Sequence, residues 1–245
     1  MVPSRLDKLR RLMAESGIRA YLVPSEDAHM SEYLPECWNR RAWLTGFDGS
    51  AGEAIVTDAM AALWTDSRYF IQAADQLAGS GITLQKMGLS DTPTQLQWLR
   101  EQLDPGDRVG VDARLVTHRR MTELKESLSR FDLELVPMDS NLVDRIWEDQ
   151  PQMPVDPIQI HPLDLAGTSV SEKLELVRGA LVDTGSDACV LTTLDDVAWL
   201  FNIRGRDVPY NPVVIAYGIV TASDAYLFVD PRKVDDAIRE TLGNQ

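Results

Sequence analysis

The sequence predicts an α/β protein: a domain with a mixed sheet of about six strands flanked by helices, followed by a second, incomplete copy of a similar domain. Three observations lead to this prediction. Short apolar runs alternate with helical segments of about a dozen residues. A proline-rich stretch at 149–165 interrupts the alternation, and the pattern then starts again near Ser171.

The first elements follow from capping and turn residues. Ser4, with Asp7 three positions later, is typical of a capped helix start, and Gly17 is typical of a helix end. Thr57-Asp58 separates two apolar runs, as a hairpin turn does. We therefore expect a helix at 4–17, strands at 20–23, 54–56 and 60–64, and a helix at 66–76.

Further along the chain, strands and helices alternate. Pro93 suits the first turn of a helix, and Leu96, Leu99 and Leu103 fall on one face of it. Helices between strands provide the crossovers that parallel or mixed sheets need. The expected elements are a strand at 82–87, a helix at 92–103, a strand at 108–112, a helix at 117–128 and a strand at 131–136.

Four prolines lie between residues 149 and 165, and proline suits neither a helix interior nor a central strand. This segment is therefore the best domain boundary. The sequence predicts a first domain at 1–150, a linker at 151–165 and the first half of a second domain at 166–245.

The second part repeats the first. The helix from Ser171 to Gly185 spans 185 − 171 = 14 positions, against 17 − 4 = 13 in the first copy. Ala-Trp-Leu occurs at 42–44 and at 198–200, in the same slot of both copies. The alternative is a chance match between short units. We expect strands at 188–191, 213–217 and 225–229 and a final helix at 231–242, and we expect the chain to be a fragment of a longer protein.

Charge and composition exclude several classes of partner. The chain has 24 basic and 38 acidic residues, a net charge of −14, which disfavours nucleic acid and anionic membrane surfaces. No stretch approaches the roughly 20 apolar residues of a membrane span. The charged N-terminus does not match a signal peptide, and the two cysteines indicate no disulfide framework. A cytoplasmic protein is the default expectation.

Few residues suggest chemistry of their own. The three histidines are scattered, so we assign no catalytic residue and no metal ligand to this chain. His29 is expected in a loop and His118 at the edge of the core. The glycine-rich loop 46–52 lacks the pattern of a nucleophile elbow or a phosphate-binding loop, and it is interpreted as a tight turn with close backbone packing.

The segment from Trp64 to Tyr69 is the most informative. It places Asp66 and Arg68 where a strand ends and a helix begins, and ligands commonly bind at such positions in open α/β sheets. Arg68 could bind a carboxylate or a peptide carbonyl. The alternative, which the residues alone favour, is that Asp66 caps the helix and Arg68 pairs with a surface acid. A second polar loop at 202–207 carries two arginines.

Six blocks together resemble one family. They are PSEDAHMSEY at 24–33, RRAWLTGFDGSAG at 40–52, WTDSRY at 64–69, KMGLSDTPT at 86–94, NLVDRIW at 141–147 and LDDVAWLFNIRGRDVPYNPV at 194–213. In this order they are similar to the N-terminal part of aminopeptidase P, the Xaa-Pro aminopeptidase family in its three-domain form. The resemblance implies two creatinase-like domains, the second incomplete here, ahead of a catalytic domain that this chain lacks.

The resemblance also implies a function. The longer protein is expected to be a metalloprotease that removes the N-terminal residue from short peptides with proline at position 2. Its two divalent metal ions, Mn or Zn, are expected in the catalytic domain, and this chain alone is expected to be inactive. Of the family's functional residues only the peptide-contacting arginine of the WTDxRY block carries over, and it matches Arg68.

Some expectations about the assembly stay open. The resemblance allows a homodimer of the full-length protein. The alternative function is a non-catalytic protein-binding module of the same fold, like a histone-chaperone subunit, since an acidic surface suits basic partners. Prolidase and creatinase share the fold, but the long first domain and the LFNIRG block at 200–205 argue against both.

The proline-rich segment provides a first test. Limited proteolysis with proteinase K should cut between about 149 and 165 before any other site, because exposed segments without regular structure are cleaved first. Mass spectrometry of the early fragments checks this expectation. Preferred cleavage within 82–136 would contradict the boundary.

Overall fold

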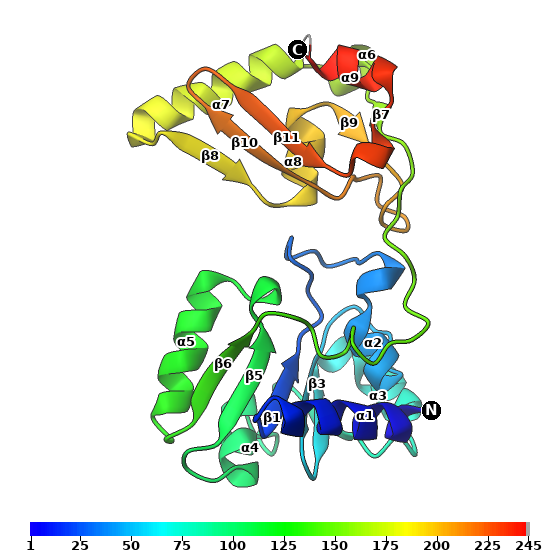
Figure 1. The fold of residues 1–245 in the computed structure, drawn as a ribbon, viewed down its shortest axis with the longest axis vertical. Coiled ribbons are helices and arrows are strands. Elements are labelled where there is room, and N and C mark those ends of the chain that lie inside the picture. The colour runs from blue at the N-terminus through cyan, green and yellow to red at the C-terminus, as the bar shows by residue number, and fades with distance from the viewer. Residues whose placement is uncertain (244–245) are drawn as a thin grey trace. The chain divides into compact units, whose positions relative to one another are not determined.

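The computed structural model of the chain describes residues 1–243, which form two compact units (Figure 1). Unit 1 comprises residues 1–32 and 37–151, and unit 2 comprises residues 33–36 and the chain from 152 onward. Each unit has its own sheet and its own hydrophobic core. No helix among residues 1–243 is long and apolar enough to span a bilayer.

Unit 1 contains the expected six-stranded mixed sheet. Its strand order is β4-β3-β2-β1-β5-β6. Strand β2 runs antiparallel to both β1 and β3, while β1–β5, β5–β6 and β3–β4 are parallel pairs. The strands are β1 (Ala20–Val23), β2 (Glu53–Thr57), β3 (Ala61–Thr65), β4 (Thr83–Lys86), β5 (Arg108–Asp112) and β6 (Glu134–Met138).

Helices cover both faces of this sheet, because alternate strand residues point to opposite sides. Tyr21 and Val23 pack with α1 (Val2–Glu15), α2 (Arg40–Thr45) and α3 (Phe70–Gln76). On the other face, Ala20 and Leu22 pack with α4 (Gln95–Gln102) and α5 (His118–Ser129). Every inner strand is therefore buried on both sides.

Several helices begin where their capping residues place them, and these positions correct the expected starts. Helix α1 begins at Val2 rather than Ser4, with a proline in its first turn. Helix α4 begins after Thr94 rather than at residue 92, because Thr94 and Gln97 form a capping box. Pro93 thus precedes the cap instead of lying in the first turn.

Unit 2 repeats the order of the first elements of unit 1. Strands β8 (Ala188–Leu191), β10 (Ala216–Thr221) and β11 (Ala225–Val229) form an antiparallel sheet in the order β11-β10-β8. This arrangement matches β3-β2-β1 of unit 1 and supports the inferred duplication. The longer helices are α7 (Val170–Thr184), α8 (Leu194–Leu200) and α9 (Asp236–Gly243).

Two strands, one cap and the final helix differ from expectation. Residues 231–233 form a 3₁₀ turn, so α9 begins only at Asp236. Strand β6 is 134–138 rather than 131–136, since Phe131 and Asp132 form the turn that ends α5 and Asp132 has a positive φ. Strand β10 is 216–221 rather than 213–217. Helix α7 is capped by Ser169, whose hydroxyl accepts from the Glu172 N–H, and not by Ser171.

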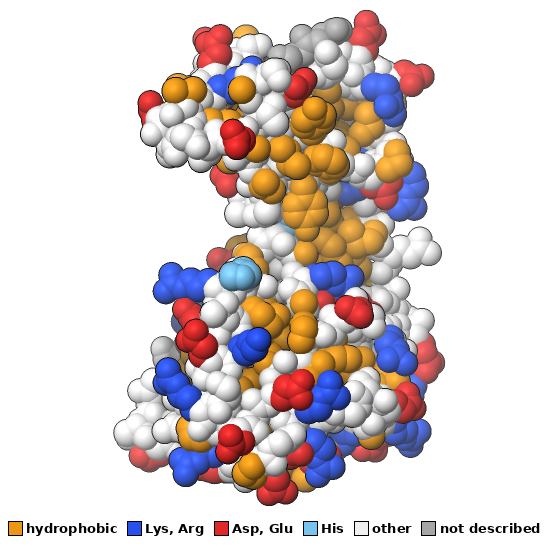
Figure 2. Space-filling view, turned by 60° about the vertical axis from the view of Figure 1, so that its left-hand side comes forward, with side chains coloured by type: hydrophobic (Ala, Val, Ile, Leu, Met, Phe, Trp, Pro, Cys, Tyr) orange, Lys and Arg blue, Asp and Glu red, His pale blue; other side chains and the backbone are white. Residues whose placement is uncertain are grey.

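One face of the unit 2 sheet is largely apolar at its surface. Val190 on β8 and Tyr226 and Phe228 on β11 are each about half exposed or more. Their strand neighbours, including Leu191 and Leu227, turn the other way into the core. Figure 2 shows hydrophobic side chains gathered on this unit, whereas charges of both signs are interspersed over unit 1.

The expected linker is partly structured. Residues 152–157 contain no helix or strand, and most of them are exposed. Strand β7 (Gln159–Ile160), however, pairs with β9 (Ile203–Arg204), and α6 (Leu163–Ala166) is helical. Beyond residue 157 the segment therefore contains short regular elements that the sequence did not predict. We therefore expect the first proteolytic cleavage between residues 152 and 157, where the chain has no helix or strand.

A buried ion pair in unit 2 provides a stability test. Lys233 donates to the Asp207 carboxylate, both side chains are at most 2% exposed, and the Ile215 N–H also donates to Asp207 at 2.6 Å. Lys233→Met should lower the free energy of unfolding by about 3–5 kcal/mol, because it leaves a buried carboxylate without its cation.

Urea unfolding followed by circular dichroism measures this loss. Arg239→Met is the matched control, since Arg239 is exposed on α9 and its removal should change stability by about 0.5 kcal/mol or less. Equal midpoints for the two variants would show that the pair contributes nothing.

Candidate functional site

The glycine-rich loop 46–52 is held by a buried arginine. Arg41, at 6% exposure on α2, donates from Nε to the Ser25 hydroxyl at 2.9 Å and from Nη1 to the Phe47 carbonyl at 2.7 Å. Its Nη2 donates to the Gly49 carbonyl. Burial lowers the pKa of Arg41 to about 10, so the guanidinium is still charged at neutral pH.

Close packing explains two glycines of this loop. A Cβ at Gly49 would lie 2.4 Å from the Phe47 ring, and a Cβ at Gly52 would lie 3.0 Å from the Trp64 carbonyl. Any larger residue would therefore force the loop away from the sheet. The interpretation of residues 46–52 as a tightly packed turn is confirmed.

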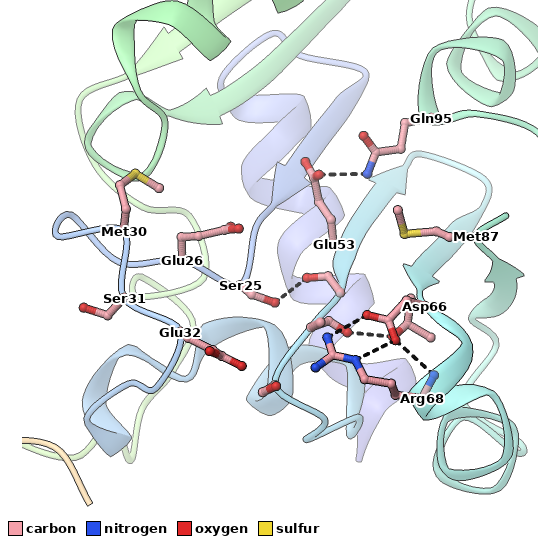
Figure 3. Close-up of a pocket in the computed structure, with 14 residues that line it drawn as sticks. Ser25, Glu26, Met30, Ser31, Glu32, Glu53, Asp66, Arg68, Met87 and Gln95 are labelled. Atoms are coloured by element: carbon pink, nitrogen blue, oxygen red, sulfur yellow. Dashed lines mark hydrogen bonds and ion pairs between the residues drawn. The ribbon is translucent and has the colours of Figure 1, made fainter. Parts of the chain in front are cut away.

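This loop forms one wall of a cavity of about 650 Å³ in unit 1 (Figure 3). The cavity lies where β1 and β3 end, at the same edge of the sheet because both run antiparallel to β2. Four carboxylates and one arginine are the charged groups of its lining. The lining residues are Ser25, Glu26, Met30, Ser31, Glu32, Ser50, Ala51, Gly52, Glu53, Thr65, Asp66, Arg68, Met87 and Gln95.

Arg68 lies in this lining and pairs with Asp66. Asp66 caps the short 3₁₀ helix η2 (Ser67–Tyr69) by accepting from the Arg68 N–H at 3.0 Å. The Arg68 side chain returns to the same carboxylate, with Nε 3.0 Å from Oδ1 and Nη2 2.8 Å from Oδ2 (Figure 3). Its side chain remains 59% exposed, and its guanidinium lies 5.2 Å from the centre of the Tyr69 ring.

The same Asp-x-Arg pairing occurs at two other strand ends. Arg114 contacts Asp112 after β5, in η3 (Ala113–Leu115), and Arg232 contacts Asp230 after β11, in η4 (Pro231–Lys233). In each pair the backbone N–H, Nε and Nη2 of the arginine all donate to the aspartate. The pairing is thus a local feature of the chain, and what sets Arg68 apart is the cavity that it lines.

Glu53 is a second charged residue of the cavity lining that is held by a hydrogen bond. Gln95 donates to its carboxylate at 2.8 Å, and Arg120 contacts Gln95 in turn at 3.4 Å. Burial is the main influence on this carboxyl and raises its pKa, although the Gln95 hydrogen bond opposes the change. Sequence reasoning did not single out Glu53. The sequence feature that could have identified Glu53 is its position as the first residue of β2, directly after the glycine-rich loop.

The other residues considered from the sequence lie outside the cavity. His29 is buried, and its ring stacks on Trp38 with centroids 5.9 Å apart. His118 is exposed on α5, which corrects its expected place at the core edge. Arg204 of the second polar loop donates to the Ala198 and Ile203 carbonyls. Residues 1–243 contain no group of three or more His, Cys, Asp or Glu side chains that could hold a metal ion.

This fold, with its cavity at the strand ends of unit 1, defines a known class of domain. The chain belongs to the Creatinase/Prolidase N-terminal domain family: the family profile matches residues 5–146, and a second profile of the same description matches residues 149–245. Both units are therefore domains of this family.

Particular relatives match the chain over almost its whole length. It is 46% identical over 248 residues to a protein named aminopeptidase P2 of Arabidopsis thaliana, covering 100% of this chain and 35% of the relative. It is 45% identical over 242 residues to a probable Xaa-Pro aminopeptidase P of Coccidioides posadasii, covering 98% of this chain and 37% of that protein. The chain thus spans little more than a third of these relatives.

A solved structure agrees with these relatives. The crystal structure of X-prolyl aminopeptidase from Caenorhabditis elegans, described as a cytosolic enzyme with a di-nuclear active site, matches with a TM-score of 0.94 and 38% identity. The match covers 100% of this chain and 41% of that one. The expected resemblance to aminopeptidase P is confirmed for the region that this chain spans.

The raised pKa of Glu53 predicts a pH-dependent effect on stability. When a carboxyl has a higher pKa in the folded state than in the unfolded state, the folded protein becomes less stable as the pH rises. The loss begins near the ordinary carboxyl pKa of 4.5 and is complete above the pKa of the folded state. Glu53→Gln keeps an acceptor for Gln95 but cannot ionise. The variant should therefore gain stability relative to the wild type as the pH rises above 4.5.

Chemical denaturation at a series of pH values measures the difference. Glu126→Gln, on the exposed surface of α5, is the control and should follow the wild-type course. If the difference between Glu53→Gln and the wild type did not change with pH, burial of the ionised carboxylate would carry no cost.

Proposed function

We propose that this chain is the non-catalytic N-terminal region of a metallo-aminopeptidase that removes the N-terminal residue from short peptides with proline at position 2. The observation that carries the proposal is the match of almost the whole chain to proteins named aminopeptidase P2, Xaa-Pro aminopeptidase P and X-prolyl aminopeptidase, combined with an exposed arginine in a cavity of unit 1. The domains proposed are 1–150 and 166–245, joined by 151–165.

The role proposed for this region is to shape access to the active site and to bind peptide through Arg68. A guanidinium with an exposed face can donate to an acceptor on a peptide. Because the chain spans only part of its relatives, the catalytic groups are proposed for another domain, and this region would pack against that domain. The proposed enzyme resides in the cytoplasm, as the name of the Caenorhabditis elegans enzyme suggests.

The metals of the proposed enzyme would not be bound by this region. The solved relative is described as having a di-nuclear site, whereas residues 1–243 contain no group of three or more His, Cys, Asp or Glu side chains that could hold a metal ion. Two divalent ions, Mn or Zn, are therefore proposed for the catalytic domain. A homodimer is proposed for the full-length protein on family resemblance alone.

The alternative of a protein-binding module gains no support from the comparisons. The relatives that match most of the chain are named as aminopeptidases, and none of the names quoted above refers to a chaperone. Hydrolysis of an Xaa-Pro peptide by the full-length protein separates the two functions, because a binding module has no turnover.

Arg68→Ala tests the role of the cavity. In the full-length protein, kcat/KM for an Xaa-Pro peptide should fall about tenfold to a hundredfold, the usual cost of losing a hydrogen bond from a charged donor. The melting temperature of the 245-residue chain should change by no more than about 2 °C, since the side chain is exposed.

Arg232→Ala is the matched control, because it removes the same Asp-x-Arg pairing in unit 2. Its kcat/KM should stay within about twofold of the wild type. If Arg68 serves only to brace the turn after β3, Arg68→Ala would lower the melting temperature and leave the kinetics unchanged, which contradicts the proposal.

A further inference from the structure

The pairing with Asp66 uses only part of the donor capacity of Arg68. Nε and Nη2 of the guanidinium contact the carboxylate, and the backbone N–H does so as well. An arginine side chain has five N–H groups in a fixed plane. Within residues 1–243, no hydrogen bond or ion pair engages Nη1, and Figure 3 shows that nitrogen on the side away from Asp66, among the residues that line the cavity.

Because the guanidinium is planar, fixing two of its nitrogens also fixes the third. Asp66 is itself held in place, since it caps η2 through the Arg68 N–H. The hydrogen bonds from Arg68 lower the pKa of Asp66, so the carboxylate is ionised at neutral pH. The direction of Nη1 therefore depends on Asp66 rather than on the flexible stem of the arginine.

The charge of the lining limits what Nη1 can bind. Asp66 offsets the positive charge of Arg68, and the remaining charged residues of the lining are Glu26, Glu32 and Glu53. Four acids against one arginine leave a formal charge of 1 − 4 = −3, or −2 when Glu53 is protonated. A carboxylate entering this cavity meets repulsion, whereas a neutral carbonyl can accept from Nη1 without that cost.

We propose that Asp66 is a positioning residue that turns Nη1 of Arg68 into the cavity and makes it a donor to a main-chain carbonyl of the peptide instead of to the peptide's terminal carboxylate. The proposal rests on the proposed peptide-binding role of Arg68. It resolves the choice between the two acceptors, carbonyl and carboxylate, that the sequence left open.

The test uses the full-length protein and two matched substrates, an Xaa-Pro-Xaa tripeptide with a free carboxylate and the same peptide with a C-terminal amide. Asp66→Asn is the informative variant, because asparagine can still accept from the Arg68 N–H and cap η2 but carries no charge. Asp230→Asn makes the same change at the pairing in unit 2 and is the control.

We expect Arg68→Ala to lower kcat/KM for both peptides by the same factor, because the acceptor is present in both. Asp66→Asn should raise KM for the amide by about threefold or more with little change in kcat. It should also shift the ratio of kcat/KM, free carboxylate over amide, by about threefold towards the carboxylate, since the freed arginine now favours an anion. Asp230→Asn should leave both KM and the ratio unchanged.

The outcomes separate this inference from the function on which it rests. Unchanged kinetics of Arg68→Ala with both peptides would overturn the peptide-binding role itself. If Arg68→Ala impairs both peptides but Asp66→Asn matches Asp230→Asn, the positioning role of Asp66 is wrong. If Arg68→Ala impairs only the peptide with the free carboxylate, Arg68 binds the terminal carboxylate and the assigned acceptor is wrong.

Discussion

The cavity of unit 1 depends on one buried cation, Arg41. Its guanidinium donates to the Phe47 and Gly49 carbonyls and to the Ser25 hydroxyl, which itself donates to the Gly52 carbonyl. Without Arg41 these buried carbonyls would lose their donors, at a cost of about 1–3 kcal/mol each. One side chain thus joins the end of β1 to the loop before β2 and holds a cavity wall that contains little regular structure.

Arg68 combines a recurring structural feature with a place in the lining of the cavity. The Asp-x-Arg pairing ends β3, β5 and β11 with the same three contacts, because an aspartate that caps a 3₁₀ helix lies within reach of the arginine two residues later. At β3 alone of these three ends does the arginine line the 650 Å³ cavity. Bracing and the proposed binding are therefore compatible, since the contacts with Asp66 leave Nη1 of the guanidinium unused.

The two units show how far a duplicated pattern extends. Both contain, in order, a helix, a strand, a helix, a hairpin and a helix, and unit 2 adds the short strand β9 before its hairpin. In both units the hairpin pairs with the first strand. In unit 1, α4 and α5 pack on the second face of the sheet, with Leu99 and Leu128 in that core. In unit 2, the corresponding face exposes Val190, Tyr226 and Phe228. The two units thus share the run of elements that local sequence patterns encode. They differ in whether helices cover the second face of the sheet.

The sequence by itself determined the order of the elements, the hairpin at Thr57-Asp58 and the repeat, because periodicity and turn residues are local. It also supplied the hypothesis about Arg68. The predicted helix starts were wrong by about two residues where the true capping residue lay near the predicted one, as at Ser169 and Thr94. Only the tertiary structure decided the rest of the site. Glu53 meets Gln95 across 42 positions, and Arg41 meets Ser25 across 16. No local pattern encodes such contacts, since they depend on how the folded sheet brings distant strand ends together.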